Sequence, residues 1–484
     1  MFIYDQKMKR NNLYIIGILA CLLLTTGCDK MLETKSQTLL PQDKLQTEAG
    51  CEAMLYGVYD LMQETAFYGR DVLTVPEVLA DNSRLSPIAS RYKGQADNRI
   101  GSHMDIWVES YEIIALLNEV IEYAEKLPET SKAKAIWGEA LTLRGLTYFN
   151  LARVYGREPG RLVDNFDLCV PLILKAFFYN GGPMGEEVYP SRATVAAVWA
   201  QIEKDLNDGF TLLKGNDDGL MPKRAGSLAA KALLSRVYLY EGKWKECVEA
   251  SDYVTENAPF EVYGGTYTDI FAKGEETIFY LYFTNSENWG SSSLQSINGM
   301  MESGLDSEGY DMGKGVGDAD LCVAEELIAL YDQKNDLRFK AFRKAKINGE
   351  KVWWTMKFNG WQGAFGLDNV PVIRLSEIVL NRAEAEAELK KETAALADVN
   401  EIRTKRGLEA KTVSGDALLK EILLQRRLEL AQEGHRFFDL KRRGETITKP
   451  AGRIPVPYVD FRVVARISET QMDANTNLVN NPGY

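Results

Sequence analysis

The residues with the most distinctive chemistry are aromatic side chains that stand beside amide, carboxylate and guanidinium groups in polar stretches of the sequence. Trp289 follows Asn288 in the stretch TNSENWGSSS. The apolar face of a sugar ring stacks on such an aromatic ring, and its hydroxyl groups bond to polar side chains at the edge. Packing of Trp289 against the protein body is an equally good interpretation. The candidate ligand-binding residues are Trp289, Asn288, Asp81, Asn82, Arg84, Tyr92 and Tyr68.

A second set of charged residues lies near the C-terminus, in LLQRRLELAQEGHRFFDLKRRG at 423–444. Glu429 and Glu433 could form the acid and base pair of a glycosidase, which requires one carboxyl group with a raised pKa. Neighbouring arginines lower carboxyl pKa values and favour a structural ion-pair network instead. We therefore predict no catalytic residue and no enzymatic activity. If one helix continues through the segment, its charged residues share one side: Arg426, Glu429, Glu433, Arg436, Asp439 and Arg443.

The sequence gives little indication of a metal site, a phosphate-binding loop or a disulfide framework. The two histidines, His103 and His435, are too few for a multi-histidine zinc site. The glycines of MGKGVGD lack the flanking strand and helix and the GKS or GKT sequence of a phosphate loop. The four cysteines after residue 28 are far apart, so we expect buried thiols and not disulfides. No cofactor is predicted, although structural calcium stays open at the aspartates of the central stretch, Asp306, Asp311, Asp318 and Asp320.

Helical periodicity dominates the elements that must position these residues. Apolar residues recur at three- and four-residue steps, which is typical of helices that bury one face. The predicted helices cover 108–126, 134–155, 194–213, 226–241, 244–256, 374–389, 393–406 and 415–432.

Several of these helices pair in the manner of tetratricopeptide hairpins. The pairs lie at 134–213, 232–254 and 375–403. Long inserts separate them, and one contains the strand signal ETIFYLYF at 276–283. The expected fold is mostly α, a scaffold of helical hairpins with large loop-rich inserts and minor β-hairpins. The inserts are 81–106, 157–190, 257–321 and 345–371.

The N-terminus has the pattern of a lipoprotein signal. Basic residues precede a short apolar run from Leu13 to Leu24, which is shorter than the roughly 20 residues of a membrane-spanning helix. Small residues follow and lead directly to Cys28, which resembles the cysteine that is acylated in lipoproteins. An acylated Cys28 would anchor the chain at the outer membrane. The acidic stretch that follows resembles surface-export signals, which favours the cell exterior.

The overall charge restricts the partners. The formal net charge is −12 and the isoelectric point is about 5.1. Nucleic-acid binders need a basic surface, so no nucleic-acid partner is predicted.

Several segments together resemble the SusD/RagB family of glycan-binding outer-membrane lipoproteins. The most specific is the run at 423–444, in which Gln425 stands where the family pattern has glutamate. The segments VIRLSEIVLNRAEAEA, VNEIRTKRGL, IPVP and the final NNPGY are also similar. In the N-terminal half, GEALTLRGLTYFNLARVYG and RATVAAVWAQIEKDL match as well.

The resemblance implies a helical scaffold with a shallow glycan site in its loops. It also implies a partner, a TonB-dependent (SusC-like) transporter to which the protein delivers oligo- or polysaccharide. The expected organisation is a signal peptide at 1–27, a SusD-like N-terminal region at 28–215, and a RagB/SusD C-terminal region at 216–484 with a central insert at 257–371. A peptide importer, a lipid-anchored glycosidase and a purely structural scaffold are the alternatives.

Overall fold

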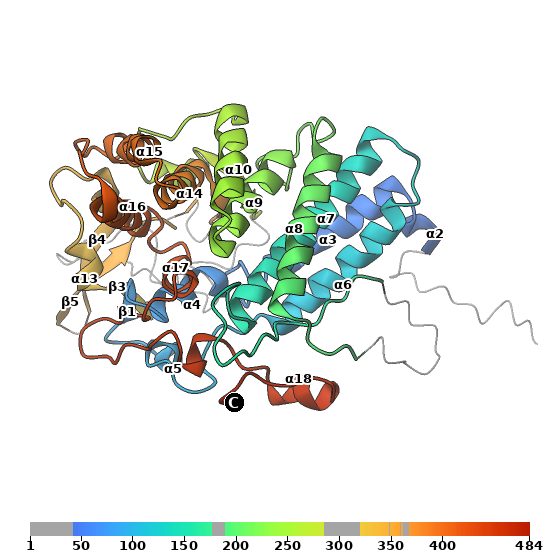
Figure 1. Ribbon diagram of the computed structural model, residues 1–484, viewed down its shortest axis with the longest axis horizontal. Helices are drawn as coiled ribbons and strands as arrows, with labels where there is room; N and C mark the ends of the chain where they lie inside the picture. Colours follow the sequence, from blue (N-terminus) through green and yellow to red (C-terminus); the bar gives the residue numbers. More distant parts are fainter. Residues whose placement is uncertain (1–41, 177–188, 285–319, 348, 359, 362–366) are drawn as a thin grey trace, which may run out of the picture. The chain divides into compact units, whose positions relative to one another are not determined.

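The computed structural model describes residues 42–176, 189–284, 320–347, 349–358, 360–361 and 367–484 (Figure 1). Residues 46–484 form one compact unit by their contacts. The unit before it, residues 1–45, is described only at helix α2 (Gln42–Leu45). The predicted lipidation site Cys28 and the predicted binding residues Asn288 and Trp289 lie outside the described residues.

The eight helices predicted from the apolar stripes are all present. The structure adds helix α3, which the sequence analysis did not assign, and several short helices. The longer helices are α3 (Glu48–Met62), α6 (Trp107–Ala124), α7 (Ser131–Tyr155), α8 (Val195–Leu213), α9 (Ser227–Glu241), α10 (Trp244–Asn257), α14 (Leu375–Glu388), α15 (Glu392–Lys405) and α16 (Gly415–Glu429). The shorter ones are α4 (Asp71–Val78), α5 (Lys93–Ala96), α11 (Asp269–Lys273), α13 (Glu325–Ile328), α17 (Arg436–Arg442) and α18 (Glu469–Ala474).

Successive long helices pack side by side, so that α3 contacts α6, α6 contacts α7, and the series continues through α8, α9 and α10 to α14 (Figure 1). The three predicted hairpins correspond to the pairs α7–α8, α9–α10 and α14–α15. Helix α14 also packs on α16, which joins the C-terminal helices to the array. The mostly α, hairpin-based fold is therefore confirmed.

Small residues allow helices α7 and α8 to approach closely. Helix α7 begins where the Thr130 side chain accepts a hydrogen bond from the Ala133 backbone N–H at 3.0 Å, the usual N-cap arrangement. Eight residues along, a Cβ atom on Gly138 would lie 2.8 Å from the backbone oxygen of Gly209 on α8 and 2.8 Å from Leu213 Cγ. Because real Cβ atoms do not come so close to a backbone oxygen, this crossing requires glycine.

Two small antiparallel sheets supply the β-structure. One sheet has the strand order β1-β3-β5-β4, and the other pairs β2 with β6. Strand β2 confirms the signal at 276–283, and β4 with β5 forms a predicted minor hairpin. The strands are β1 (Ser83–Leu85), β2 (Thr277–Leu281), β3 (Leu321–Val323), β4 (Phe342–Ile347), β5 (Glu350–Thr355) and β6 (Val370–Arg374).

The thiols lie in the interior, as predicted. Cys51, Cys169, Cys247 and Cys322 are all buried, and burial raises the pKa of Cys51 to about 11 and that of Cys247 to about 12. Within the described ranges, no helix combines the length and the apolar character that crossing a membrane requires.

The close helix crossing gives a test of the packing. We expect Gly138→Ala to lower the free energy of unfolding by about 1–3 kcal/mol, because the added methyl group must push α8 away. Gly57→Ala is the matched control: its Cβ would have Leu116 Cδ2 as a neighbour at an ordinary 3.5 Å. In a helix, replacing glycine with alanine raises the free energy of unfolding by up to about 1 kcal/mol. Urea unfolding followed by circular dichroism measures both, and equal effects of the two variants would contradict this account.

Candidate ligand-binding site

The structure places Asp81 and Asn82 inside the body, where both bind segments near the C-terminus. Asp81 accepts hydrogen bonds from Arg436 Nε at 2.7 Å and from the Thr448 hydroxyl at 2.6 Å. Asn82 donates to Glu77 Oε2 at 2.9 Å and accepts from Arg427 Nε at 3.0 Å. These contacts hold the loop after α4 against the α16–α17 junction.

Tyr92 and Tyr68 are also buried, with 8% and 4% of their surfaces exposed. The Tyr92 hydroxyl donates to Asp71 Oδ1 at 3.2 Å, and the Tyr68 hydroxyl accepts from Asn150 Nδ2 at 3.1 Å. Arg84 is half-buried, with Nη1 3.0 Å from Glu350 Oε1. Of the predicted binding residues that are described, Arg84 therefore presents the most accessible side chain, and the structure gives the others partners within the protein. Their predicted contact with a ligand stays a prediction.

The two glutamates considered for acid–base chemistry are core residues. Glu429 Oε1 lies 2.8 Å from both Arg374 Nη1 and Arg406 Nη2, and Glu433 Oε1 lies 2.7 Å from Lys357 Nζ. Burial by itself raises a carboxyl pKa, but Arg406 and Arg374 outweigh it and hold the pKa of Glu429 well below its ordinary value. The same balance lowers the pKa of Glu433. The predicted structural role of the two glutamates is confirmed, but their partners lie outside the 423–444 segment that the prediction considered.

The helix through this segment is interrupted, contrary to the continuous helix on which a single charged side depended. Helix α16 ends at Glu429 and α17 begins at Arg436. Between them Gly434 has φ +80°, and a Cβ atom there would clash with the Val72 carbonyl oxygen on α4. Asp439 still pairs with Arg426 at 2.8 Å, across the break.

Metal binding has no described site. Among the residues that the structure describes, no three His, Cys, Asp or Glu side chains gather as a metal site would need. Of the aspartates for which calcium was left open, Asp306, Asp311 and Asp318 lie outside the described residues. Asp320 is held by Arg91 Nε at 2.7 Å and by the backbone N–H groups of Ser90 and Arg91.

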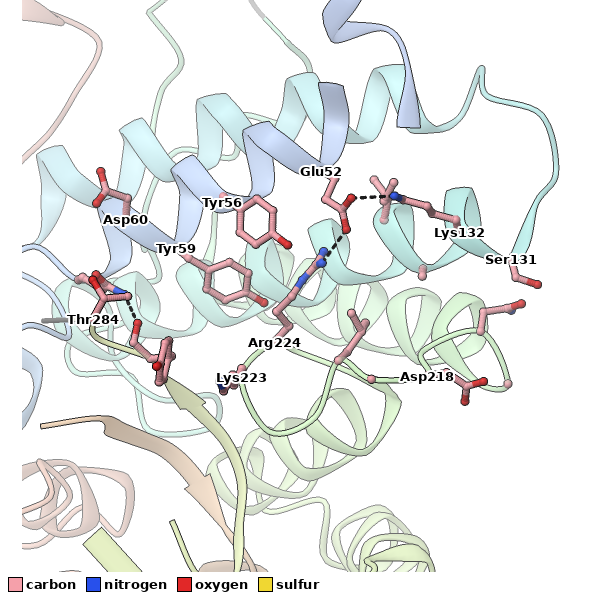
Figure 2. Close-up of a pocket in the computed structure, with 18 residues that line it drawn as sticks. Glu52, Tyr56, Tyr59, Asp60, Ser131, Lys132, Asp218, Lys223, Arg224 and Thr284 are labelled. Atoms are coloured by element: carbon pink, nitrogen blue, oxygen red, sulfur yellow. Dashed lines mark hydrogen bonds and ion pairs between the residues drawn. The ribbon is translucent and has the colours of Figure 1, made fainter. Parts of the chain in front are cut away.

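A cavity of about 780 Å³ opens between helix α3, the start of α7, the loop from α8 to α9 and the end of strand β2 (Figure 2). This volume is typical of small-molecule sites. One face of α3 forms a wall, since Glu52, Tyr56 and Asp60 recur at four-residue steps. The opposite stripe of α3 is buried in the body and consists of Cys51, Leu55, Val58 and Met62.

Ion pairs hold the polar side of the cavity in place. Glu52 bridges two cations, with Oε2 2.7 Å from Lys132 Nζ and Oε1 2.9 Å from Arg224 Nη1 (Figure 2). Arg224 Nε also donates to the buried Glu139 at 2.9 Å, and the Tyr59 hydroxyl donates to the same carboxylate. The hydrogen bond from Lys132 and the charge of Arg224 lower the pKa of Glu52, so this carboxylate stays ionised.

Two tyrosines give the cavity exposed aromatic surface. Tyr56 is 56% exposed and Tyr282 is 38% exposed. The Arg224 guanidinium carbon lies 5.2 Å from the centre of the Tyr56 ring, and Lys223 Nζ lies 4.0 Å from the centre of the Tyr282 ring. Gln63 Nε2 donates to the Tyr282 backbone oxygen at 2.8 Å and fixes the strand end against α3. Aromatic rings beside carboxylate, amide and ammonium groups suit a ligand with apolar faces and many hydroxyl groups.

The sequence analysis did not select Tyr56 and Tyr282. The sequence does contain a pattern that indicates the α3 wall. A polar stripe at 52, 56 and 60 lies beside an apolar stripe at 51, 55, 58 and 62. In the strand, period-two alternation separates Tyr280 and Tyr282 from Phe279 and Leu281. Neither pattern predicts that Tyr56 and Tyr282, more than 200 residues apart in the sequence, line the same cavity.

Comparisons with known proteins identify the family. Residues 30–239 match the family model described as "Starch-binding associating with outer membrane", and residues 350–484 match the model of the SusD family. SusD-like protein P2 of Formosa agariphila is 24% identical over 97% of this chain and 99% of its own length.

Solved structures of similar fold point to the same family as the sequence relatives. A SusD superfamily protein from Bacteroides thetaiotaomicron superposes with a TM-score of 0.76 at 26% identity, covering 90% of this chain and all of that one. A laminarin-binding SusD-like protein superposes with a TM-score of 0.70 at 23% identity, again over 90% of this chain and all of that one. The chain belongs to the SusD/RagB family, as the sequence motifs predicted.

The contacts of Asp81 predict a structural role that stability measurements can detect. Burial opposes ionisation, but Arg436 and Arg427 lower the pKa of Asp81 to about 2. Because the folded pKa lies below the unfolded value of about 3.9, Asp81 stabilises the fold above pH ~4 and loses that contribution as pH falls through the folded pKa. We expect Asp81→Asn to cost about 3 kcal/mol at neutral pH, since it leaves Arg436 unpaired.

Urea unfolding at pH 7 and at progressively lower pH measures this cost for Asp81, and the difference from wild type should shrink on acidification. Asp60→Asn is the control, because Asp60 is exposed and forms no ion pair within the described part of the chain. An Asp81→Asn protein of unchanged stability would contradict the structural role.

Proposed function

We propose that this protein is a cell-surface lipoprotein that binds oligo- or polysaccharide and delivers it to a TonB-dependent, SusC-like outer-membrane transporter. The observation that carries the proposal is the family match over both ends of the chain, one part of which is described as starch-binding and associating with the outer membrane. The laminarin-binding relative of the same fold supports a glycan ligand. The protein acts by binding and not by catalysis.

The cavity between α3 and β2 is the described part of the proposed glycan site. Tyr56 and Tyr282 would stack on sugar faces, and Asp60 would accept hydrogen bonds from hydroxyl groups. Trp289 and Asn288 follow the cavity-lining Thr284 closely in the sequence and remain proposed binding residues, as does Arg84. The exposed rings make weak, exchangeable contacts, which suits capture followed by transfer.

Delivery to a transporter is tested by co-purification. A tagged protein expressed in its own host and extracted from the outer membrane in detergent should carry a β-barrel transporter with it. Recovery without any barrel counts against the delivery step and leaves glycan binding intact.

The two exposed tyrosines give a direct test of glycan binding. We expect Tyr282→Ala and Tyr56→Ala each to weaken binding about five- to tenfold, because each removes a stacking surface. Affinity electrophoresis through gels that contain different polysaccharides, laminarin among them, measures the retardation. Tyr282→Phe and Tyr56→Phe keep the rings and should keep most of the retardation.

Trp289→Ala belongs in the same gels as a test of the sequence-predicted platform. If Tyr56→Ala and Tyr282→Ala are retarded as strongly as wild type, the cavity is not the glycan-binding site. Retardation by no polysaccharide would contradict the proposed ligand class and favour a peptide cargo or a scaffold.

The lipid anchor is tested at Cys28. We expect Cys28→Ser to abolish incorporation of labelled palmitate and to shift the protein from the membrane fraction to the soluble fraction, because acyl chains supply the membrane affinity. Cys21→Ser, in the apolar part of the signal, is the control and should leave both unchanged. Full labelling of the Cys28→Ser protein would refute the assignment.

A further inference from the structure

The charged groups around the cavity are not evenly matched. Glu52 pairs with both Lys132 and Arg224, and Glu139 pairs with Arg224 at the inner side, so two of the three lining cations are already neutralised within the protein. The third cation, Lys223, lies over the Tyr282 ring. Two further carboxylates line the cavity, Asp60 and Asp218, and neither forms an ion pair with any residue that the structure describes.

These two carboxylates lie at opposite ends of the cavity. Figure 2 shows Asp60 and Thr284 at one end of the cavity and Asp218 in the α8–α9 loop at the other, with Tyr56 and Tyr59 between them. Both aspartates are exposed to solvent. A glycan that lies along the tyrosines would therefore meet a negative charge at each end.

A carboxylate acts differently on neutral and on acidic sugars. It accepts strong, charge-assisted hydrogen bonds from hydroxyl groups. A carboxylate or sulfate on the sugar would instead be repelled, and salt would screen that repulsion at these exposed positions. Lys223 compensates only partly, because it stands against two unpaired carboxylates and already contacts the Tyr282 ring.

We propose that this cavity selects uncharged glycans, and that Asp60 and Asp218 determine the selection by excluding glycans that carry carboxylate or sulfate groups. The inference rests on the proposed glycan-binding function and specifies its substrate class. It assigns a specificity role to two residues that the α3 wall and the α8–α9 loop place at the ends of the stacking surface.

A matched pair of ligands tests the selection. A neutral gluco-oligosaccharide and the same oligosaccharide oxidised to glucuronate differ only in the group at C6, a hydroxymethyl in one and a carboxylate in the other, and isothermal titration calorimetry of the mature chain measures both. We expect the neutral form to bind about tenfold more tightly, with a Kd that changes little between low and high salt. The Asp60→Asn, Asp218→Asn double variant should bind the oxidised form more tightly and the neutral form somewhat more weakly, because asparagine removes the repulsion and also the charge-assisted hydrogen bonds, so the about tenfold ratio of the two Kd values should shrink toward one.

The outcomes separate this inference from the function on which it rests. An oxidised ligand that binds wild type as tightly as the neutral one, and that Tyr282→Ala weakens, overturns the selection but supports glycan binding in the cavity. Neutral binding that Tyr282→Ala and Tyr56→Ala leave unchanged also overturns the inference, because the ligand then lies elsewhere. If no neutral or acidic glycan of a broad panel binds, the proposed function fails and the inference fails with it.

Discussion

A buried cluster of arginines and glutamates joins the C-terminal half of the structure. Arg374 lies at the boundary of β6 and α14, Arg406 follows α15, and Arg338 comes from the segment before β4, and all three converge on Glu429 at the end of α16. Glu276, just before β2, binds Arg374 and Arg406. Each of these side chains is at most 2% exposed. Removing one partner from such a cluster leaves an uncompensated buried charge and costs about 3–5 kcal/mol.

The cluster also affects the ligand cavity, because it fixes the start of β2 and Tyr282 is the residue that directly follows this strand. Glu276 precedes β2, and Gln63 on α3 binds the backbone at the other end of the strand. One end of β2 is thus tied to the C-terminal helices and the other to the N-terminal array. These two attachments hold Tyr282 in the wall of the cavity that Tyr56 also lines.

The helical array was predictable from sequence because the long helices carry apolar residues at three- and four-residue steps, a local pattern, even though α7, α9 and α14 are buried on nearly all sides. That Glu429 and Glu433 form structural ion pairs was predicted, but their partners Arg374, Arg406 and Lys357 come from distant segments and not from the arginines around them in sequence. The interruption of the helix after α16 was not predictable from sequence. It includes Gly434, where only glycine fits because the Val72 backbone of α4 lies so close. Asp81 and Asn82 resembled loop residues free to bind a ligand. Their partners Arg436 and Arg427 come some 350 residues later in the chain, and no local pattern reveals them.

The four buried cysteines Cys51, Cys169, Cys247 and Cys322 can each report on the opening of the structure around them. They lie in α3, after α7, in α10 and in β3, so each belongs to a different part of the body. Burial raises their pKa values, which keeps them protonated and shielded from thiol reagents while the fold is intact. The rate at which each thiol becomes alkylated therefore reports how often its own part of the body opens. A comparison of the four alkylation rates would show whether the helices around Cys51, Cys169 and Cys247 and the sheet that contains Cys322 open together or separately.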